Sequence, residues 1–148
     1  MLQSAEHPFK LILMAKTKTS NWIFIRGLGR ETAKWEPFLT LAQNKIKSQQ
    51  PLAKFEVLDL AGNGSQKDKK SFTHIAEYCE ELRSCSKFIQ AKEPVNLITI
   101  SLASMVAIHW ASHHPQELVH VTLMNTSDKR LSKIYERMRP QNLQKAFQ

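Results

Sequence analysis

Ser101 is the residue of this chain best placed to do chemistry, because it stands directly between an apolar run and a segment with helical spacing. The run covers residues 95–100, and the helical segment begins at Leu102. A serine in such a strand–turn–helix setting is held in a strained turn, from which its hydroxyl projects as a nucleophile. The turn needs small residues two positions to either side, and Ala103 meets this need whereas Thr99 is bulkier than expected.

A serine nucleophile also needs a general base, usually a histidine, which is in turn oriented by an acid. His109 follows Ser101 by eight residues in the predicted helix, which is about 12 Å at 1.5 Å per residue. His74 is the one histidine that could be placed nearer. The remaining candidates lie farther along the helix or enter the last strand from the opposite end of the sheet: His113, His114 and His120.

Predicted strands and helices alternate along the chain, and these elements must position Ser101. Apolar runs between turn residues predict strands, and apolar residues at helical spacing predict helices. Ser71 is the expected N-cap of the second helix. The predicted strands cover residues 9–15, 21–26, 55–60, 95–100 and 118–124, and the predicted helices cover residues 33–47, 72–92 and 102–114. This alternation predicts an α/β domain with a mostly parallel sheet flanked by helices.

Four of the loops after these strands carry residues suited to a site. In a parallel sheet such loops meet at one edge, where ligands bind. Read together, they resemble the loops of α/β-hydrolase-fold proteins, specifically a bacterial subgroup of serine hydrolases, and the match covers about four-fifths of the chain in collinear order. The matching segments are RGLGRE (residues 26–31), DLAGNG (residues 59–64), TISLASM (residues 99–105) and NTS (residues 125–127).

The resemblance implies a serine esterase or acyl hydrolase acting on a small ester or acyl substrate. Ser101 would attack the acyl carbonyl, and the backbone amides of Leu28 and Leu102 would form the oxyanion hole. The pocket residues that it implies are Arg26, Gly27 and Asn125. Neither the resemblance nor the sequence indicates a cofactor or a metal.

In this family the acid and the histidine follow the strand that corresponds to residues 118–124. We therefore expect residues 1–148 to form a single, incomplete α/β-hydrolase domain that is inactive alone, with residues 128–148 as the start of a lid-like basic segment. Leu118–Met124 would then be an apolar sheet edge, available for self-association or a partner chain. Two alternatives remain, namely one piece of a split hydrolase and a non-catalytic binding or scaffold module.

The composition fits a globular protein, with 42% hydrophobic and 23% charged residues. The net charge is +8, and residues 129–148 hold six basic side chains against one acidic one. Nucleic-acid binding is not favoured, because that segment has few aromatic residues and no recognition motif. No apolar run is long enough for a membrane span, and no signal peptide is evident. Cys79 and Cys85 are expected to be reduced thiols, which predicts a cytoplasmic protein.

Overall fold

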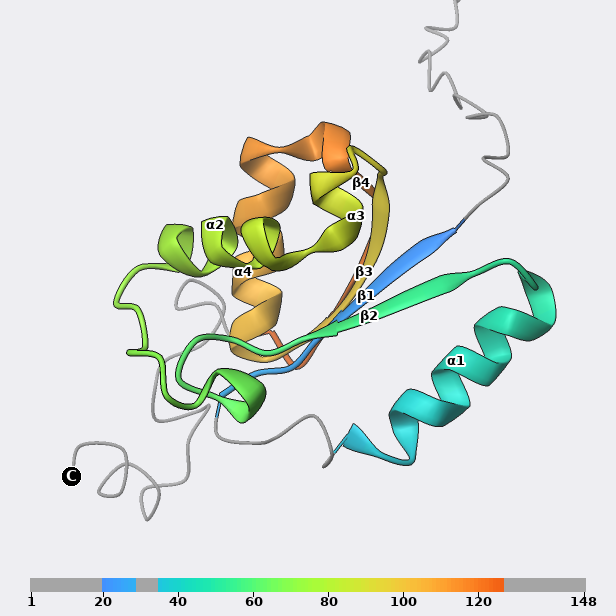
Figure 1. Ribbon diagram of the computed structural model, residues 1–148, viewed down its shortest axis with the longest axis horizontal. Helices are drawn as coiled ribbons and strands as arrows, with labels where there is room; N and C mark the ends of the chain where they lie inside the picture. The colour runs from blue at the N-terminus through green and yellow to red at the C-terminus, as the bar shows by residue number, and fades with distance from the viewer. Residues whose placement is uncertain (1–19, 29–34, 127–148) are drawn as a thin grey trace, which may run out of the picture.

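The computed structural model describes residues 20–28 and 35–126. Within them, four parallel strands form one sheet with the order β2-β1-β3-β4 (Figure 1). The strands are β1 (Asn21–Ile25), β2 (Lys54–Leu58), β3 (Val95–Ile100) and β4 (Leu118–Met124). The predicted α/β class and parallel sheet are thus confirmed. The strand predicted at residues 9–15 and the basic segment at residues 128–148 lie outside the described residues.

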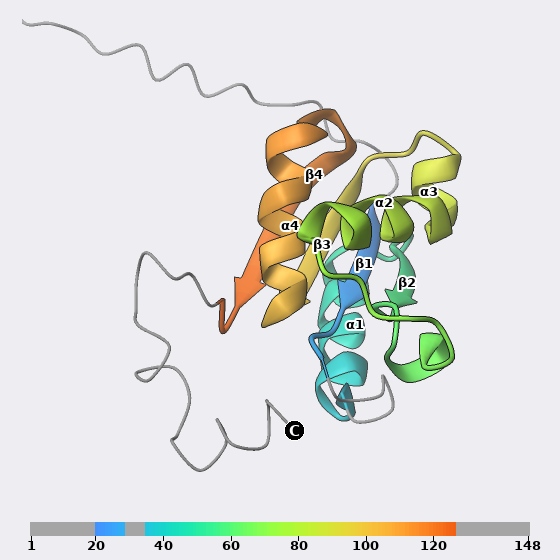
Figure 2. The same cartoon turned by 90° about the vertical axis from the view of Figure 1, so that its left-hand side faces the viewer.

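Helices cover both faces of this sheet, as the two views in Figures 1 and 2 show. They are α1 (Phe38–Gln49), α2 (Ile75–Cys85), α3 (Lys87–Gln90) and α4 (Leu102–His113), with short 3-10 turns η2 (Gly64–Gln66) and η3 (Pro115–Glu117). On one face, Phe24 and Ile98 of the sheet pack with Trp35 and Leu39. On the other face, β1 and β3 pack against α2 and α4, where Trp110 is fully buried. Double coverage explains why five of the six residues of β3 are buried.

The single helix predicted over residues 72–92 is wrong, because the chain turns at Ser86 and divides it into α2 and α3. Ser86 has extended dihedral angles (φ −74°, ψ 122°), and its hydroxyl accepts a hydrogen bond from the Ile89 N–H. The same hydroxyl donates to the carboxylate of Glu56 in β2, at 2.8 Å. A contact to a distant strand therefore ends one helix and caps the next.

The predicted N-cap at Ser71 is also wrong. The helix begins only at Ile75, after His74 in extended conformation. The Glu77 carboxylate reaches back and accepts the His74 backbone N–H at 3.0 Å. This bond belongs to a capping box between His74 and Glu77, and it satisfies one of the donors at the start of the helix.

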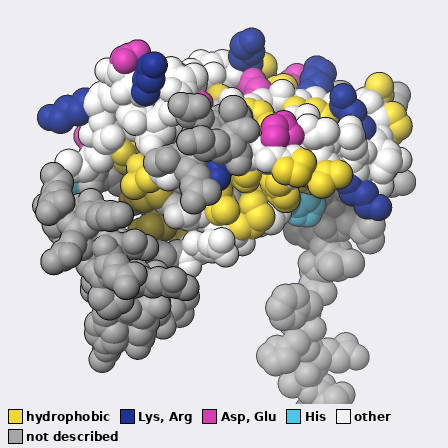
Figure 3. All heavy atoms as spheres, turned by 90° about the horizontal axis from the view of Figure 1, so that it is seen from below, with side chains coloured by type: hydrophobic (Ala, Val, Ile, Leu, Met, Phe, Trp, Pro, Cys, Tyr) yellow, Lys and Arg dark blue, Asp and Glu magenta, His cyan; other side chains and the backbone are white. Residues whose placement is uncertain are grey.

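Among the described strands, β4 pairs only with β3 and so forms one edge of the sheet. Its Val119 and Leu123 are 44% and 42% exposed, unlike the buried strand β3. Apolar side chains also gather across the middle of the molecule as seen from below (Figure 3). In the described part of the chain no helix is both long enough and apolar enough to cross a membrane.

Candidate functional site

The strand order places a switch point between β1 and β3. From β1 the chain crosses to β2 through α1, and from β2 it returns over the other face through α2 to reach β3. Where the order reverses in this way, the connections leave a crevice beyond the carboxyl ends of the two strands. Ile25 is in register with Thr99, so Gly27 and Ser101 follow at equivalent positions on neighbouring strands. The fold therefore brings both predicted site residues to the same edge of the sheet, at the switch point.

Ser101 has a backbone conformation that non-glycine residues rarely adopt, with φ 59° and ψ −124°. Such a conformation costs about 1–3 kcal/mol and persists only where the surroundings enforce it. Here the Ser101 N–H donates to the Met124 carbonyl at 2.9 Å, and the Ser101 carbonyl accepts the Ser104 N–H at 2.9 Å. The strained turn between β3 and α4 that the sequence predicts is present, with Ser101 exposed.

Gly27, which follows β1, packs directly against this turn. A Cβ atom on Gly27 would lie 2.8 Å from the Ser101 Cβ, 3.0 Å from the Ile100 carbonyl oxygen and 3.3 Å from the Ser101 Oγ. Real side chains do not approach this closely, so only glycine fits without a shift of the backbone. The Ser101 side chain therefore lies next to Gly27, beyond the carboxyl end of β1.

Thr99 was the one neighbour that the sequence marked as too bulky, and the structure accommodates it. Its side chain is fully buried, and its hydroxyl donates to the Thr122 carbonyl at 3.1 Å. The buried Ser104 hydroxyl lies 3.1 Å from the Thr99 hydroxyl and donates to the Met124 carbonyl at 3.2 Å. These two hydroxyls join the turn to β4. Sequence reasoning missed this pair, whose only signal is a hydroxyl residue on each side of Ser101.

The other predicted site residues lie at the same edge of the sheet as Ser101 and differ in how far their side chains are exposed. Leu102 is the first residue of α4, so its N–H has no carbonyl within the helix to bond and lies at the positive end of the helix dipole. Leu28 follows Gly27 and has a 55% exposed side chain. Arg26 directly follows β1 and is half-buried, and Asn125 directly follows β4 with φ 48°. All of them lie at the carboxyl edge of the sheet.

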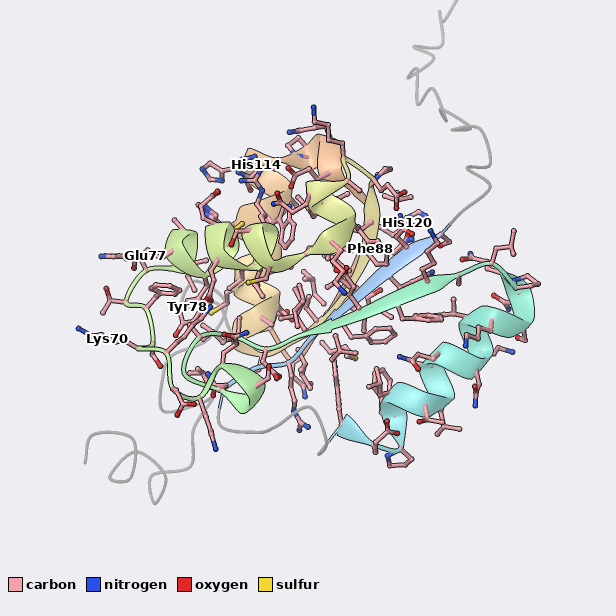
Figure 4. The ribbon with its side chains drawn as sticks, viewed as in Figure 1. Lys70, Glu77, Tyr78, Phe88, His114 and His120 are labelled. Carbon is pink, nitrogen blue, oxygen red and sulfur yellow. The ribbon has the colours of Figure 1, made fainter. Side chains whose placement is uncertain are left out.

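No described residue forms a hydrogen bond with the Ser101 hydroxyl, and the described histidines have other surroundings. The His109 and His113 rings stack on each other, and His114 contacts Glu80 at 3.1 Å. Figure 4 shows His114 and His120 near the beginning of β4, at the end of the sheet opposite Ser101. His74 precedes α2, where its backbone is bonded to Glu77. In the described part of the chain, no histidine therefore forms a hydrogen bond with the exposed Ser101.

The two cysteines offer no alternative nucleophile or metal site. Cys79 is fully buried in α2, and burial raises the pKa of its thiol to about 12, so it stays protonated at neutral pH. Cys85 is exposed at the end of the same helix, so the two thiols lie on different faces, as predicted. Residues 20–28 and 35–126 contain no group of three or more His, Cys, Asp or Glu side chains that could hold a metal ion.

Comparison with known proteins gives no match, either to models of protein families or to the sequences of curated proteins. The resemblance to α/β-hydrolases described above therefore rests on the loop segments of the sequence alone.

Proposed function

We propose that this chain carries the nucleophile half of a serine acyl-hydrolase site, with Ser101 as the nucleophile. The observation that carries the proposal is the strained Ser101 turn at the β1/β3 switch point, with Gly27 against it. A protein keeps a strained, exposed serine at this position at a cost in stability. The nucleophile elbow of α/β-hydrolases has the same strand–turn–helix arrangement.

The reaction would begin when the Ser101 Oγ attacks the carbonyl carbon of a small ester or thioester. The carbonyl oxygen gains negative charge as the tetrahedral intermediate forms, and backbone amides aimed at it lower the barrier. The amide of Leu102 at the start of α4, together with that of Leu28 beside Gly27, would serve this purpose. Arg26 and Asn125 would line the approach to the site.

The base and its orienting acid would come from a segment outside the described residues that docks beside β4. Two observations support this location. Leu123 and Val119 of β4 are exposed, and the described strands leave its outer edge unpaired. The carbonyl of Met124, the last residue of β4, accepts the Ser101 N–H, so a strand added at this edge would end close to the nucleophile.

A non-catalytic binding module is the second candidate, and the exposed position of Ser101 at the switch point is compatible with it. Such a module would use the same edge of the sheet to hold a ligand, and the serine would serve only as an exposed polar group. The two candidates differ in one property, which is whether Ser101 becomes reactive when a base is supplied.

The test is labelling of the purified chain with a fluorophosphonate, read by intact mass and peptide mapping, with and without added imidazole. The Ser101 oxygen bonds to phosphorus, fluoride leaves, and imidazole takes the hydroxyl proton. We expect little adduct from the chain alone, faster labelling at Ser101 with imidazole, and none in Ser101→Ala. Ser112→Ala is the control, because that exposed hydroxyl on α4 only bonds the Ile108 carbonyl. A folded chain that stays unlabelled in imidazole would favour the binding module.

A further inference from the structure

Two histidines lie on successive turns of α4, away from its packed side. His109 and His113 are four residues apart, their ring centroids are 3.9 Å apart, and the angle between their planes is 25°. His113 is exposed and His109 is partly exposed, whereas the buried residues of this helix include Ala103, Ala107 and Trp110. The pair therefore faces outward with both rings already side by side.

A hydrogen bond sets which nitrogen of His113 is available. Its Nδ1 lies 2.9 Å from the His109 carbonyl oxygen. A carbonyl oxygen can only accept, so the Nδ1 carries the proton and the Nε2 keeps its lone pair. Metal-binding histidines are oriented in the same way, because the nitrogen that does not bind the metal donates to a carbonyl or carboxylate.

We infer that His109 and His113 together bind a divalent late first-row transition ion, such as Ni²⁺, Cu²⁺ or Zn²⁺. Imidazole nitrogen suits these ions, and two histidines spaced i, i+4 on a helix reach one metal. Water would fill the remaining coordination positions, because the neighbouring His114 is engaged by Glu80. To share one ion the two rings must rotate out of their stack, and since His113 is exposed and His109 partly exposed, this rotation leaves the buried residues of α4 in place.

The site would be separate from Ser101. His109 follows Ser101 by eight residues, about 12 Å along the helix, and it lies toward the end of α4. The ion would tie two turns of α4 together and so stabilise the folded chain over the unfolded one. The inference does not depend on the proposed hydrolase chemistry.

Titration of the purified chain with NiCl₂ by calorimetry tests this inference. We expect one Ni²⁺ per chain, and each of the variants His109→Gln and His113→Gln should weaken binding by about tenfold or more. His120→Gln is the matched control, because it removes an exposed imidazole from β4 and should leave the affinity unchanged.

Thermal unfolding gives a second readout. Ni²⁺ at a hundredfold excess over its wild-type dissociation constant should raise the midpoint by about 5–10 °C in the wild type and in His120→Gln, and by about half of that shift or less in the other two variants. Wild-type protein that binds no Ni²⁺, or equal binding by His109→Gln and wild type, would overturn the inference.

Discussion

Gly27 and Ser101 are in direct contact across the carboxyl ends of β1 and β3, close enough that a Cβ atom on Gly27 would lie 2.8 Å from the Ser101 Cβ. These residues are far apart in the sequence, yet each restricts the other. The strained turn directs the Ser101 side chain toward Gly27, and the position of Gly27 after β1 has no room for a side chain. Changes at either position should therefore affect the other.

Gly27→Ala should destabilise the chain by about 1–3 kcal/mol, because the new methyl group overlaps the Ser101 Cβ and the Ile100 carbonyl oxygen. Urea unfolding at neutral pH measures the loss. Imidazole-dependent labelling of Ser101 should fall as well, since the serine must move. Ala53→Gly, in the turn before β2, is the control for a methyl change away from the site. Equal stability of Gly27→Ala and wild type would contradict the contact.

Ser101→Gly should stabilise the chain by about 1 kcal/mol. Glycine adopts a positive φ without strain, and this gain exceeds the larger conformational entropy that glycine loses on folding. In this background Gly27→Ala should be less harmful, since the Ser101 Cβ is absent. A double-mutant cycle by urea unfolding measures this coupling, which should be about 0.5 kcal/mol or more. Additive effects would show that the two residues act independently.

Thr99→Val should destabilise the chain by about 1–3 kcal/mol, although the shape of the side chain is kept. The substitution removes the hydroxyl that donates to the Thr122 carbonyl and contacts Ser104, and it leaves these buried groups with fewer partners. Chemical denaturation measures the loss. Thr122→Val, at an exposed position of β4, should change stability by less than about 0.5 kcal/mol. Similar losses in the two variants would argue against the buried hydroxyl pair.

Stability should fall in acid through Glu117. Arg83 donates two hydrogen bonds to this carboxylate and Trp110 a third, and the Arg83 bonds are the main reason that the pKa of Glu117 lies below its ordinary value of 4.5. A lowered folded pKa gives stability that is present above the unfolded pKa and lost as the pH falls through the folded one. The free energy of unfolding should therefore decrease below about pH 4.5.

Glu117→Gln is the test of that assignment. It should cost about 1–3 kcal/mol at pH 7, because the charge-assisted bonds are weakened, and it should flatten the acid slope. Urea unfolding between pH 3 and pH 7 measures both effects. Asp68→Asn, at an exposed position, should keep the wild-type slope. An unchanged slope in Glu117→Gln would assign the acid sensitivity to other carboxylates.

The edge of β4 should promote association of the chain with itself. Exposed apolar edges pair readily with other strands, and Lys at such positions prevents this. Sedimentation velocity over a range of concentrations should show dimers or larger species in the wild type and monomer in Val119→Lys/Leu123→Lys. Leu41→Lys, at a 64% exposed position of α1, should leave association unchanged. A wild-type chain that stays monomeric at all concentrations would contradict this prediction.

The sequence alone determined the elements whose signals are local. The limits of β3 and β4 agree with the prediction, because each is an apolar run between turn residues. The turn at Ser101 was predictable for the same reason, since a strand signal and a helix signal meet there.

Only the tertiary structure decided the features that depend on partners distant in sequence. Ser86 divides a predicted helix because its hydroxyl bonds Glu56 of β2. Thr99 fits beside the turn because Thr122 of β4 offers a carbonyl. The side chain of Ser101 meets Gly27 because β1 and β3 are neighbours in the sheet. Local sequence patterns determine which segments tend to form strands, helices and turns, whereas these contacts arise only when folding brings separate segments together.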